Sequence, residues 1–361
     1  MPAYGIAAVT ARVLGQPVSW YWIPVERETL AALSRKSNLL GALQTGGFLT
    51  TLALTGSLAW YSAGRWPWFV TLAALFLHGT AWAFLANGLH EFSHGTVFAA
   101  PGLNRFFLGI FGFLKWINPV LFWTIHGEHH KFTMYPEDEF EAASFRALTL
   151  RGYLAVAFVN LEGLHWSITT NVRHAFGRFD QAWEARLFPA SKPELRGQVA
   201  RWSRLYLVGH ATILIVAAYF QLWMLPVVIS LPAFYGGALQ WLCNQAQHAG
   251  LPGNVPDFRL CSRTVYLNRF LEFMYWHMNY HTDHHLYAGV PCYRLAQLHR
   301  VLKADMPDCP RGLIATWRGI NAIFRKQKSD PRYQYYAPVP PMRGRSPSVT
   351  RGSASTVAAA V

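Results

Sequence analysis

The chain has 361 residues, of which 52% are hydrophobic, 15% are aromatic and only 14% are charged, whereas about 25% of the residues in a typical soluble domain are charged. Its formal net charge is +14, but the basic residues are dispersed among Trp, Tyr and Phe and form no stripe, so we do not expect a nucleic-acid partner. The four cysteines show no CxxC spacing, which excludes a zinc knuckle. Long apolar runs predict an all-α integral membrane protein.

The first part of the chain predicts a membrane-interface segment followed by a helical hairpin. Residues 1–38 contain prolines and basic residues, with a short amphipathic stretch at 25–33. Residues 39–61 are almost uncharged and long enough to cross a bilayer. After a turn at 62–67, residues 68–89 form the second expected span.

The next apolar stretch, residues 105–125, is interrupted. Phe106–Phe113 is apolar, but Lys115, Asn118 and Pro119 follow it closely. Irregular backbone at membrane depth is tolerated only where protein or a water-filled cavity surrounds it. We therefore predict a re-entrant or interface-lying segment here, and no complete span.

A second hairpin is expected after a polar region that ends at residue 204. Its spans are residues 205–222 and 224–243, and they complete a membrane domain of residues 39–336. Residues 337–361 are dominated by Pro, Arg, Ser and Ala, which predicts a disordered tail.

The charge distribution predicts the orientation. Four spans would place residues 1–38, 89–204 and 244–361 on one side of the membrane. These segments contain every Lys and Arg except Arg65, and all 18 acidic residues. The positive-inside rule then makes this side cytoplasmic, and a helical cap on it would carry the histidines described next.

Three clusters of histidine follow apolar runs. HEFSH places two imidazoles at i and i+4, whereas HGEHH and HTDHH each place three at i, i+3 and i+4. On a helix such positions share one face. Eight imidazoles at one face of a membrane are too many for one ion and predict a two-metal site. They are His90, His94, His126, His129, His130, His281, His284 and His285.

A fourth polar motif, NQAQH, closes the last expected span. It places Asn244 and His248 at i and i+4, so His248 is a candidate ninth ligand and Asn244 a candidate partner of a metal-bound water. Glu91, Glu128 and Asp283 lie inside the clusters, where we expect them to accept hydrogen bonds from ring N–H groups and orient the ligands. The alternative for these carboxylates is an ordinary solvated charge at a helix end.

The ligand types favour redox chemistry. Imidazole suits zinc, copper, iron and nickel. A histidine-rich, carboxylate-poor site beside a membrane suggests iron that activates O2, because an apolar chain entering from the bilayer offers an unactivated C–H bond. A membrane zinc hydrolase and a metal or haem transporter are the alternatives from other classes. Transport predicts ligands inside the spans, whereas these histidines gather at the span ends.

Four other histidines have simpler explanations. His78 and His210 lie within expected spans, where an ionisable side chain is a functional hypothesis by default. We expect both to be neutral and hydrogen-bonded within the helix bundle. His165 and His174 lie in the polar region and are expected to be ordinary interface histidines.

The motifs HEFSH, HGEHH, NQAQH and HTDHH, in this order around two hydrophobic hairpins, resemble those of the membrane fatty acid desaturase and hydroxylase superfamily. The resemblance covers residues 35–320. It implies that the eight cluster histidines and His248 bind two irons, that Asn244 acts through water, and that O2 is the co-substrate. The substrate would be a lipid acyl chain.

The resemblance implies desaturation as the simplest reaction, with fatty-chain hydroxylation, epoxidation or decarboxylation as near alternatives. HEFSH has three residues between its histidines, where acyl-CoA Δ9 desaturases usually have four. The sequence contains no HPGG stretch of a fused cytochrome b5. We therefore expect an external electron donor of the cytochrome b5 or ferredoxin type, with its reductase.

Overall fold

The computed structural model describes residues 16–136 and 150–341. Within these ranges the regular structure is helical, and β-pairing is limited to isolated bridges. The expected all-α architecture is therefore confirmed. Residues 1–15 of the N-terminal segment and residues 342–361 of the expected tail lie outside the described residues.

The helices are short apart from a few long ones. In chain order they are α1 (Arg27–Leu33), α2 (Asn38–Ser62), α3 (Trp68–Ala83), α4 (Leu85–Ser93), α5 (Pro101–Lys115), α6 (Pro119–Phe132), α7 (Leu150–Ala157), α8 (Leu161–Ala175), α9 (Ala182–Leu187), α10 (Pro193–Phe220), α11 (Met224–Ile229), η3 (Pro232–Phe234), α12 (Ala238–Ala246), α13 (Phe258–Cys261), α14 (Arg269–Met274), α15 (His281–Leu286), η4 (Cys292–Arg294), α16 (Leu295–Leu302), η5 (Lys303–Asp305) and α17 (Gly312–Ser329).

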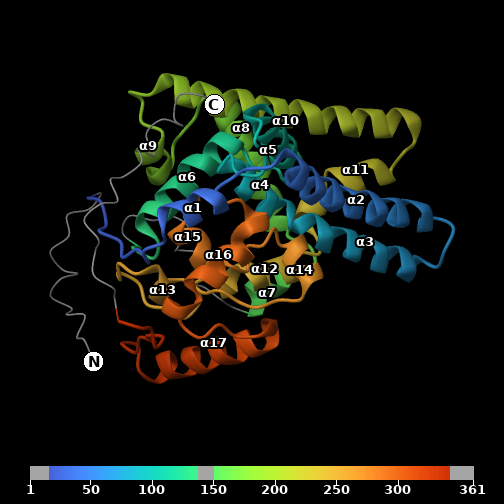
Figure 1. Ribbon diagram of the computed structural model, residues 1–361. Helices are drawn as coiled ribbons and strands as arrows, with labels where there is room; N and C mark the ends of the chain where they lie inside the picture. The colour runs from blue at the N-terminus through green and yellow to red at the C-terminus, as the bar shows by residue number, and fades with distance from the viewer. Residues whose placement is uncertain (1–15, 137–149, 342–361) are drawn as a thin grey trace.

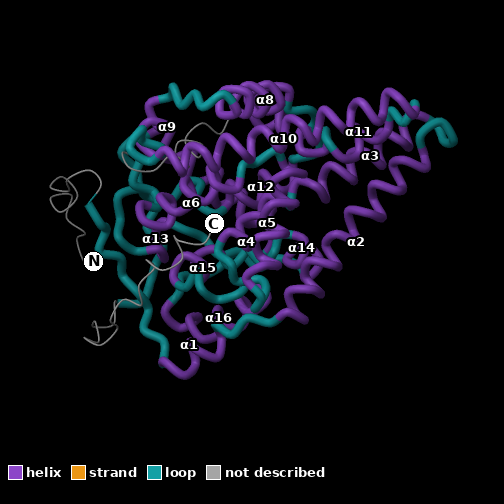
Figure 2. Tube along the Cα trace, turned by 90° about the horizontal axis from the view of Figure 1, so that it is seen from above, coloured by secondary structure: helices purple, strands orange, loops and turns teal. Residues whose placement is uncertain are grey.

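Helices α2 and α3 form the first hairpin and project together from one end of the molecule (Figures 1 and 2). The bounds of α2 agree with the stretch expected at 39–61, and α3 and α4 together cover the one expected at 68–89. α2 is not among the helices that are apolar enough to count as candidate spans. Many outward-facing residues on this hairpin and on the second half of α10 are large and apolar, and Leu54, Leu72 and Ile215 are each more than half exposed. Such surface is unfavourable in water and suits lipid contact.

Among the described residues, two helices are long and apolar enough to cross a membrane: Trp68–Ser93, which joins α3 and α4, and Pro193–Phe220. A third candidate exists if α5 and α6 form one bent span, because their axes meet at 99°. This bend falls at residues 116–118, where the sequence predicts an interruption. It is the geometry of either a broken span or a re-entrant loop.

The last expected span, residues 224–243, is not a continuous helix, which corrects the sequence prediction. It is divided into α11, η3 and the start of α12. Pro232 has no N–H to continue a helix, and Gly236 adopts a positive φ of 72°. These two residues interrupt the helix although the stretch is apolar, and the prediction depended on that apolar composition. The four-span arrangement therefore remains a proposal.

The interior joins the first hairpin to the segment before α15. Trp276 is fully buried, and its ring lies 5.4 Å from Phe48, 5.3 Å from Phe92 and 5.6 Å from Phe111, measured between centroids. These partners belong to α2, α4 and α5. Gly88 on α4 allows the approach, because a Cβ there would lie 2.4 Å from the Phe111 ring. The aromatic cluster thus fixes α4 relative to α15.

Labelling of introduced cysteines tests the proposed topology. Gly102 and Lys131 are exposed residues on either side of the α5–α6 bend. In a Cys309→Ser background, Gly102→Cys and Lys131→Cys should both react with a membrane-impermeant maleimide from the cytoplasmic side, since the other three native cysteines are buried. Reaction of the two sites from opposite sides would contradict the topology and make the α5–α6 pair a complete span.

Candidate metal centre

Nine histidines converge from four segments of the chain. His90 lies in the last turn of α4 and His94 caps that helix, and His248 follows the end of α12. The HGEHH histidines lie on α6 and the HTDHH histidines on α15. All nine histidines expected from the sequence are therefore brought together by the fold.

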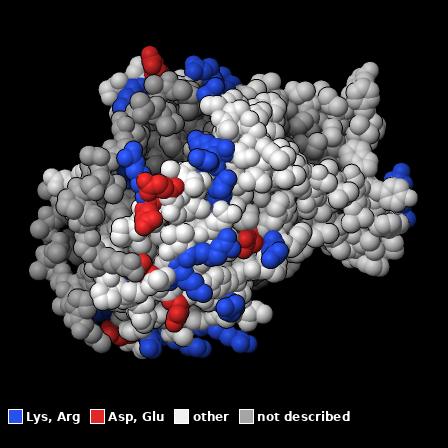
Figure 3. All heavy atoms as spheres, viewed as in Figure 1, with Lys and Arg blue, Asp and Glu red and all other residues white. Residues whose placement is uncertain are grey.

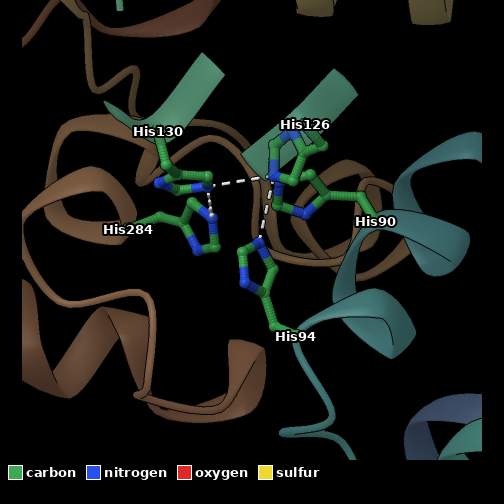
Figure 4. Close-up of side chains that lie close together, drawn as sticks. All are labelled: His90, His94, His126, His130 and His284. Carbon is green, nitrogen blue, oxygen red and sulfur yellow. Dashed lines mark hydrogen bonds between the residues drawn. The ribbon is translucent and has the colours of Figure 1, made fainter. Parts of the chain in front are cut away.

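The nine imidazoles form two groups. Within each group, one ring nitrogen of every member lies within 4.8 Å of those of all the others. The five-histidine group, whose rings point toward one another in Figure 4, contains His90, His94, His126, His130 and His284. The four-histidine group contains His129, His248, His281 and His285, all buried.

The helical spacing distributes two of the clusters between both groups. On α6, His126 and His130 belong to the five-histidine group and His129 to the other. On α15, His284 belongs to the five-histidine group, whereas its neighbours in the cluster belong to the four-histidine group. Two metal ions held here would therefore be tied together by α6 and α15.

The four-histidine group presents lone pairs to its centre. The Nε2 of His281 lies 2.8 Å from that of His248 and 3.0 Å from that of His285, which is in turn 3.1 Å from His129 Nε2. His248 Nδ1 donates to the carbonyl oxygen of Cys261 at 2.8 Å, so its Nε2 carries a lone pair in the neutral ring. Crowded nitrogens with this arrangement suit a central cation.

The five-histidine group has the same character. His126 Nε2 lies 3.1 Å from His94 Nε2 and 2.9 Å from His130 Nε2, and His130 Nε2 lies 3.3 Å from His284 Nε2. His90 Nδ1 shares a hydrogen bond with the Glu91 carboxyl group at 3.0 Å, and His90 Nε2 is buried with no hydrogen-bond partner in the described structure. A buried polar atom with this orientation fits a metal ligand.

Burial keeps the rings of α15 neutral. It lowers the pKa of His281, His284 and His285 well below the usual histidine value, and repulsion from the neighbouring imidazoles lowers it further. Neutral imidazole is the form that binds metals. These rings are consequently ready to bind at neutral pH without releasing a proton.

Local interactions explain why the two ligand helices form where they do. Asn118 caps α6 by accepting hydrogen bonds from the N–H groups of Val120 and Leu121, and Pro119 starts the helix with a fixed φ. The six-residue α15 is too short to be stable alone. Thr282 on α15 accepts a hydrogen bond from Ser262 at 3.0 Å, which attaches the helix to the segment after α13.

The three carboxylates inside the clusters have different partners. Glu91 binds His90 as expected. Asp283 instead accepts from Thr264 at 2.8 Å and binds His299 at 3.0 Å, so it positions the α15 backbone and not a cluster ring. Glu128 pairs with the exposed Lys131 at 2.9 Å, and its expected orienting role stays a prediction.

Several polar contacts were not predicted from the sequence. The Oδ1 of Asn244 accepts a hydrogen bond from the side-chain amide of Asn87 on α4 at 3.1 Å. Asn87 lies one helical turn before His90, and this spacing is the feature of the sequence that could have pointed to Asn87 as part of the site. His299 has no comparable indication, because it meets Asp283 only through the packing of α16 on α15.

His78 and His210 are hydrogen-bonded within the helix bundle, as expected. His78 contacts Thr55 and the carbonyl of Val228, each at 2.9 Å. His210 contacts Ser230 at 2.9 Å and the carbonyl of Phe113. His174 pairs with Glu184 and His165 is exposed.

Two adjoining groups of imidazoles that could each hold a metal ion thus lie next to helices that are apolar enough to cross a membrane. The family described as fatty acid desaturase matches residues 63–317, and the chain belongs to this family. The matched range contains all nine histidines. No curated protein matches the sequence closely enough to count as a relative.

A single ligand substitution should remove metal from one group. His285→Ala should lower bound iron from about two ions per chain to about one and abolish turnover, because loss of a direct ligand weakens binding strongly. His165→Ala, at an exposed position on α8, is the matched control and should keep both irons. Metal analysis of the purified variants measures this, and full iron content in His285→Ala would contradict the assignment.

Asn244 and His248 should behave differently if the first acts through water and the second binds directly. Asn244→Ala should lower turnover by about tenfold or more with little loss of iron, while His248→Ala should lower both. Iron content and single-turnover product, measured on the same preparations, separate the two roles. Normal product and two irons in His248→Ala would restrict the ligands to the eight cluster histidines.

Proposed function

We propose that this protein is an O2-dependent di-iron oxidoreductase that desaturates a lipid acyl chain. The observation that carries the proposal is the pair of adjoining, largely buried groups of five and four imidazoles. Membership of the fatty acid desaturase family supports a lipid substrate and oxidation of its acyl chain. The apolar helices support a membrane location.

Iron fits the residues present. The two groups contain nitrogen ligands only, and neutral imidazole suits iron among the transition metals. The nine histidines would hold the two ions, with Asn244 binding a metal-bound water. When bound, the iron pair supplies the O2-dependent oxidation of an unactivated C–H bond.

The protein's own contribution is to orient the rings and keep water out. The Cys261 carbonyl fixes the tautomer of His248, and the Glu91 carboxyl group orients the ring of His90, so that each ring directs Nε2 toward its group. Thr133 contacts His285 Nδ1 at 3.4 Å on the outer side of that ring. Six of the nine rings are less than 4% exposed, which limits side reactions of an oxidising site with solvent.

The domain limits and the orientation are part of the proposal. Residues 39–336 would form the membrane domain, with residues 1–38 at the interface and the histidine groups on the cytoplasmic face. The location of all but one Lys and Arg on the corresponding segments supports this orientation. A separate cytochrome b5 or ferredoxin with its reductase would supply electrons.

The reaction balance distinguishes desaturation from its nearest alternative. Desaturation consumes O2, two electrons and two protons, removes two hydrogens from neighbouring carbons, and releases two waters. Hydroxylation consumes the same reactants, but leaves one oxygen atom on the chain and releases one water. Both use the same site.

Lipid mass spectrometry of a host that expresses the protein tests the proposal. We expect acyl chains that have lost two hydrogen atoms, and His126→Ala should make none because a proposed ligand is absent. Gain of one oxygen atom would replace desaturation by hydroxylation. Unchanged acyl chains with free fatty acid released would favour a zinc hydrolase.

A further inference from the structure

A cluster of exposed basic side chains covers α16 and α17, and we call it the α16–α17 surface. Figure 3 shows Lys and Arg gathered over α16 and along the edge formed by α17. Its members are Arg300, Lys303, Arg311, Arg318, Arg325, Lys326, Lys328 and Arg332, all exposed. The same stretch of chain contains three aspartates, of which Asp305 is buried.

These cations are available to a partner. Lys and Arg residues that pair with carboxylates elsewhere in the described structure are Lys131, Arg173 and Arg259, none of which belongs to this surface. Two of the three aspartates, Asp308 and Asp330, are exposed, so the eight cations are in large excess. A surface with such an excess of one sign attracts a partner of the opposite sign and accelerates association. The α16–α17 surface therefore fits an acidic macromolecule.

A chain of contacts leads from this surface to the metal centre. The guanidinium of Arg311 lies 5.3 Å from the centre of the Tyr266 ring. The Tyr266 hydroxyl is 2.8 Å from His299 Nε2, and His299 Nδ1 is 3.0 Å from Asp283. Asp283 precedes His284 of the five-histidine group. The surface thus lies at the outer end of a short, packed route to α15.

A cavity brings the outside close to the same helix. It has a volume of about 440 Å³, and its lining includes Thr264, Thr282 and Lys326. Thr282 lies between two residues of the HTDHH cluster, and Thr264 donates to Asp283. Little protein therefore separates the α16–α17 surface from the back of α15.

The position of the surface favours a protein partner over lipid. Large exposed apolar side chains gather on α2, α3 and α10, whereas α16 and α17 carry Val301 and Ile314. In Figure 1, α17 lies at the edge of the molecule opposite α10. A helix in the lipid interface would expose a continuous apolar face, which this surface lacks.

We propose that the α16–α17 surface docks the small acidic protein that delivers electrons to the metal centre. This rests on the proposed function, which requires two electrons for each O2 consumed. Two reduced one-electron carriers would dock in turn, and each would leave oxidised. With two protons and two substrate hydrogens, their electrons complete the reduction of O2 to two waters.

Charge reversal at the surface tests the proposal. Arg300→Glu/Lys303→Glu changes two exposed positions. Lys192→Glu/Arg201→Glu, at the exposed N-cap of α10 and on its first half, is the matched control. Turnover in neutral detergent is measured against the concentration of reduced [2Fe–2S] ferredoxin, and separately of soluble cytochrome b5. For at least one carrier, the surface variant should raise KM about tenfold or more, with kcat nearly unchanged. The control should resemble the wild type.

Iron content and dithionite-driven turnover keep the result interpretable. Both should be unchanged in the surface variant, because reduction by a small molecule needs no docking. An unchanged KM for both carriers, or an equal rise in the control variant, would overturn the docking proposal. An effect confined to vesicles with anionic lipid, and absent in neutral detergent, would assign the surface to lipid instead. If the wild-type protein were inactive with both carriers and with dithionite, the proposed function itself would be overturned.

Discussion

The structure depends on nine imidazoles, seven of them buried, whose ring nitrogens face one another. In water such rings would hydrogen-bond to solvent, but here Nε2 atoms approach to about 3 Å in a buried space. Each neutral ring has only one N–H, and a ring nitrogen that carries the hydrogen has no lone pair with which to accept another. These contacts therefore cannot all be hydrogen bonds. A cation bound at the centre of each group would attract the lone pairs that otherwise repel one another. The fold is therefore suited to holding two cations.

The scaffold holds short helices in place by contacts from outside the site. The α15 helix carries three of the rings on only six residues, and it is held by Ser262, Thr264 and His299. The aromatic cluster around Trp276 fixes α4 against the segment that leads to α15. Because packing and hydrogen bonds fix these elements, the rings remain close together although lone pairs that face one another repel.

Much of the site could be predicted because helical spacing is a local property. Positions i, i+3 and i+4 place histidines on one face, and the fold brings all nine expected residues together. The sequence could not predict that His129 and His130 belong to different groups, since that depends on how α6 meets α15. His299 and Asn87 were missed for the same reason: their partners are distant in sequence.

The fold was predictable to a similar extent. The bounds of α2 and of α3–α4 follow from uncharged runs, and the break before α6 follows from Lys115, Asn118 and Pro119. The prediction that residues 224–243 form one continuous helix was wrong. Hydropathy takes no account of the backbone conformations that Pro232 and Gly236 impose. Apolar composition alone does not establish a span.

The central claim is that the two histidine groups hold two iron ions. Anomalous X-ray scattering from crystals of the iron-loaded protein, recorded on both sides of the iron absorption edge, tests it most directly. The account predicts two anomalous peaks, one among the rings of His90, His94, His126, His130 and His284, and one among those of His129, His248, His281 and His285. A single peak, or peaks that appear only at the zinc edge, would contradict it.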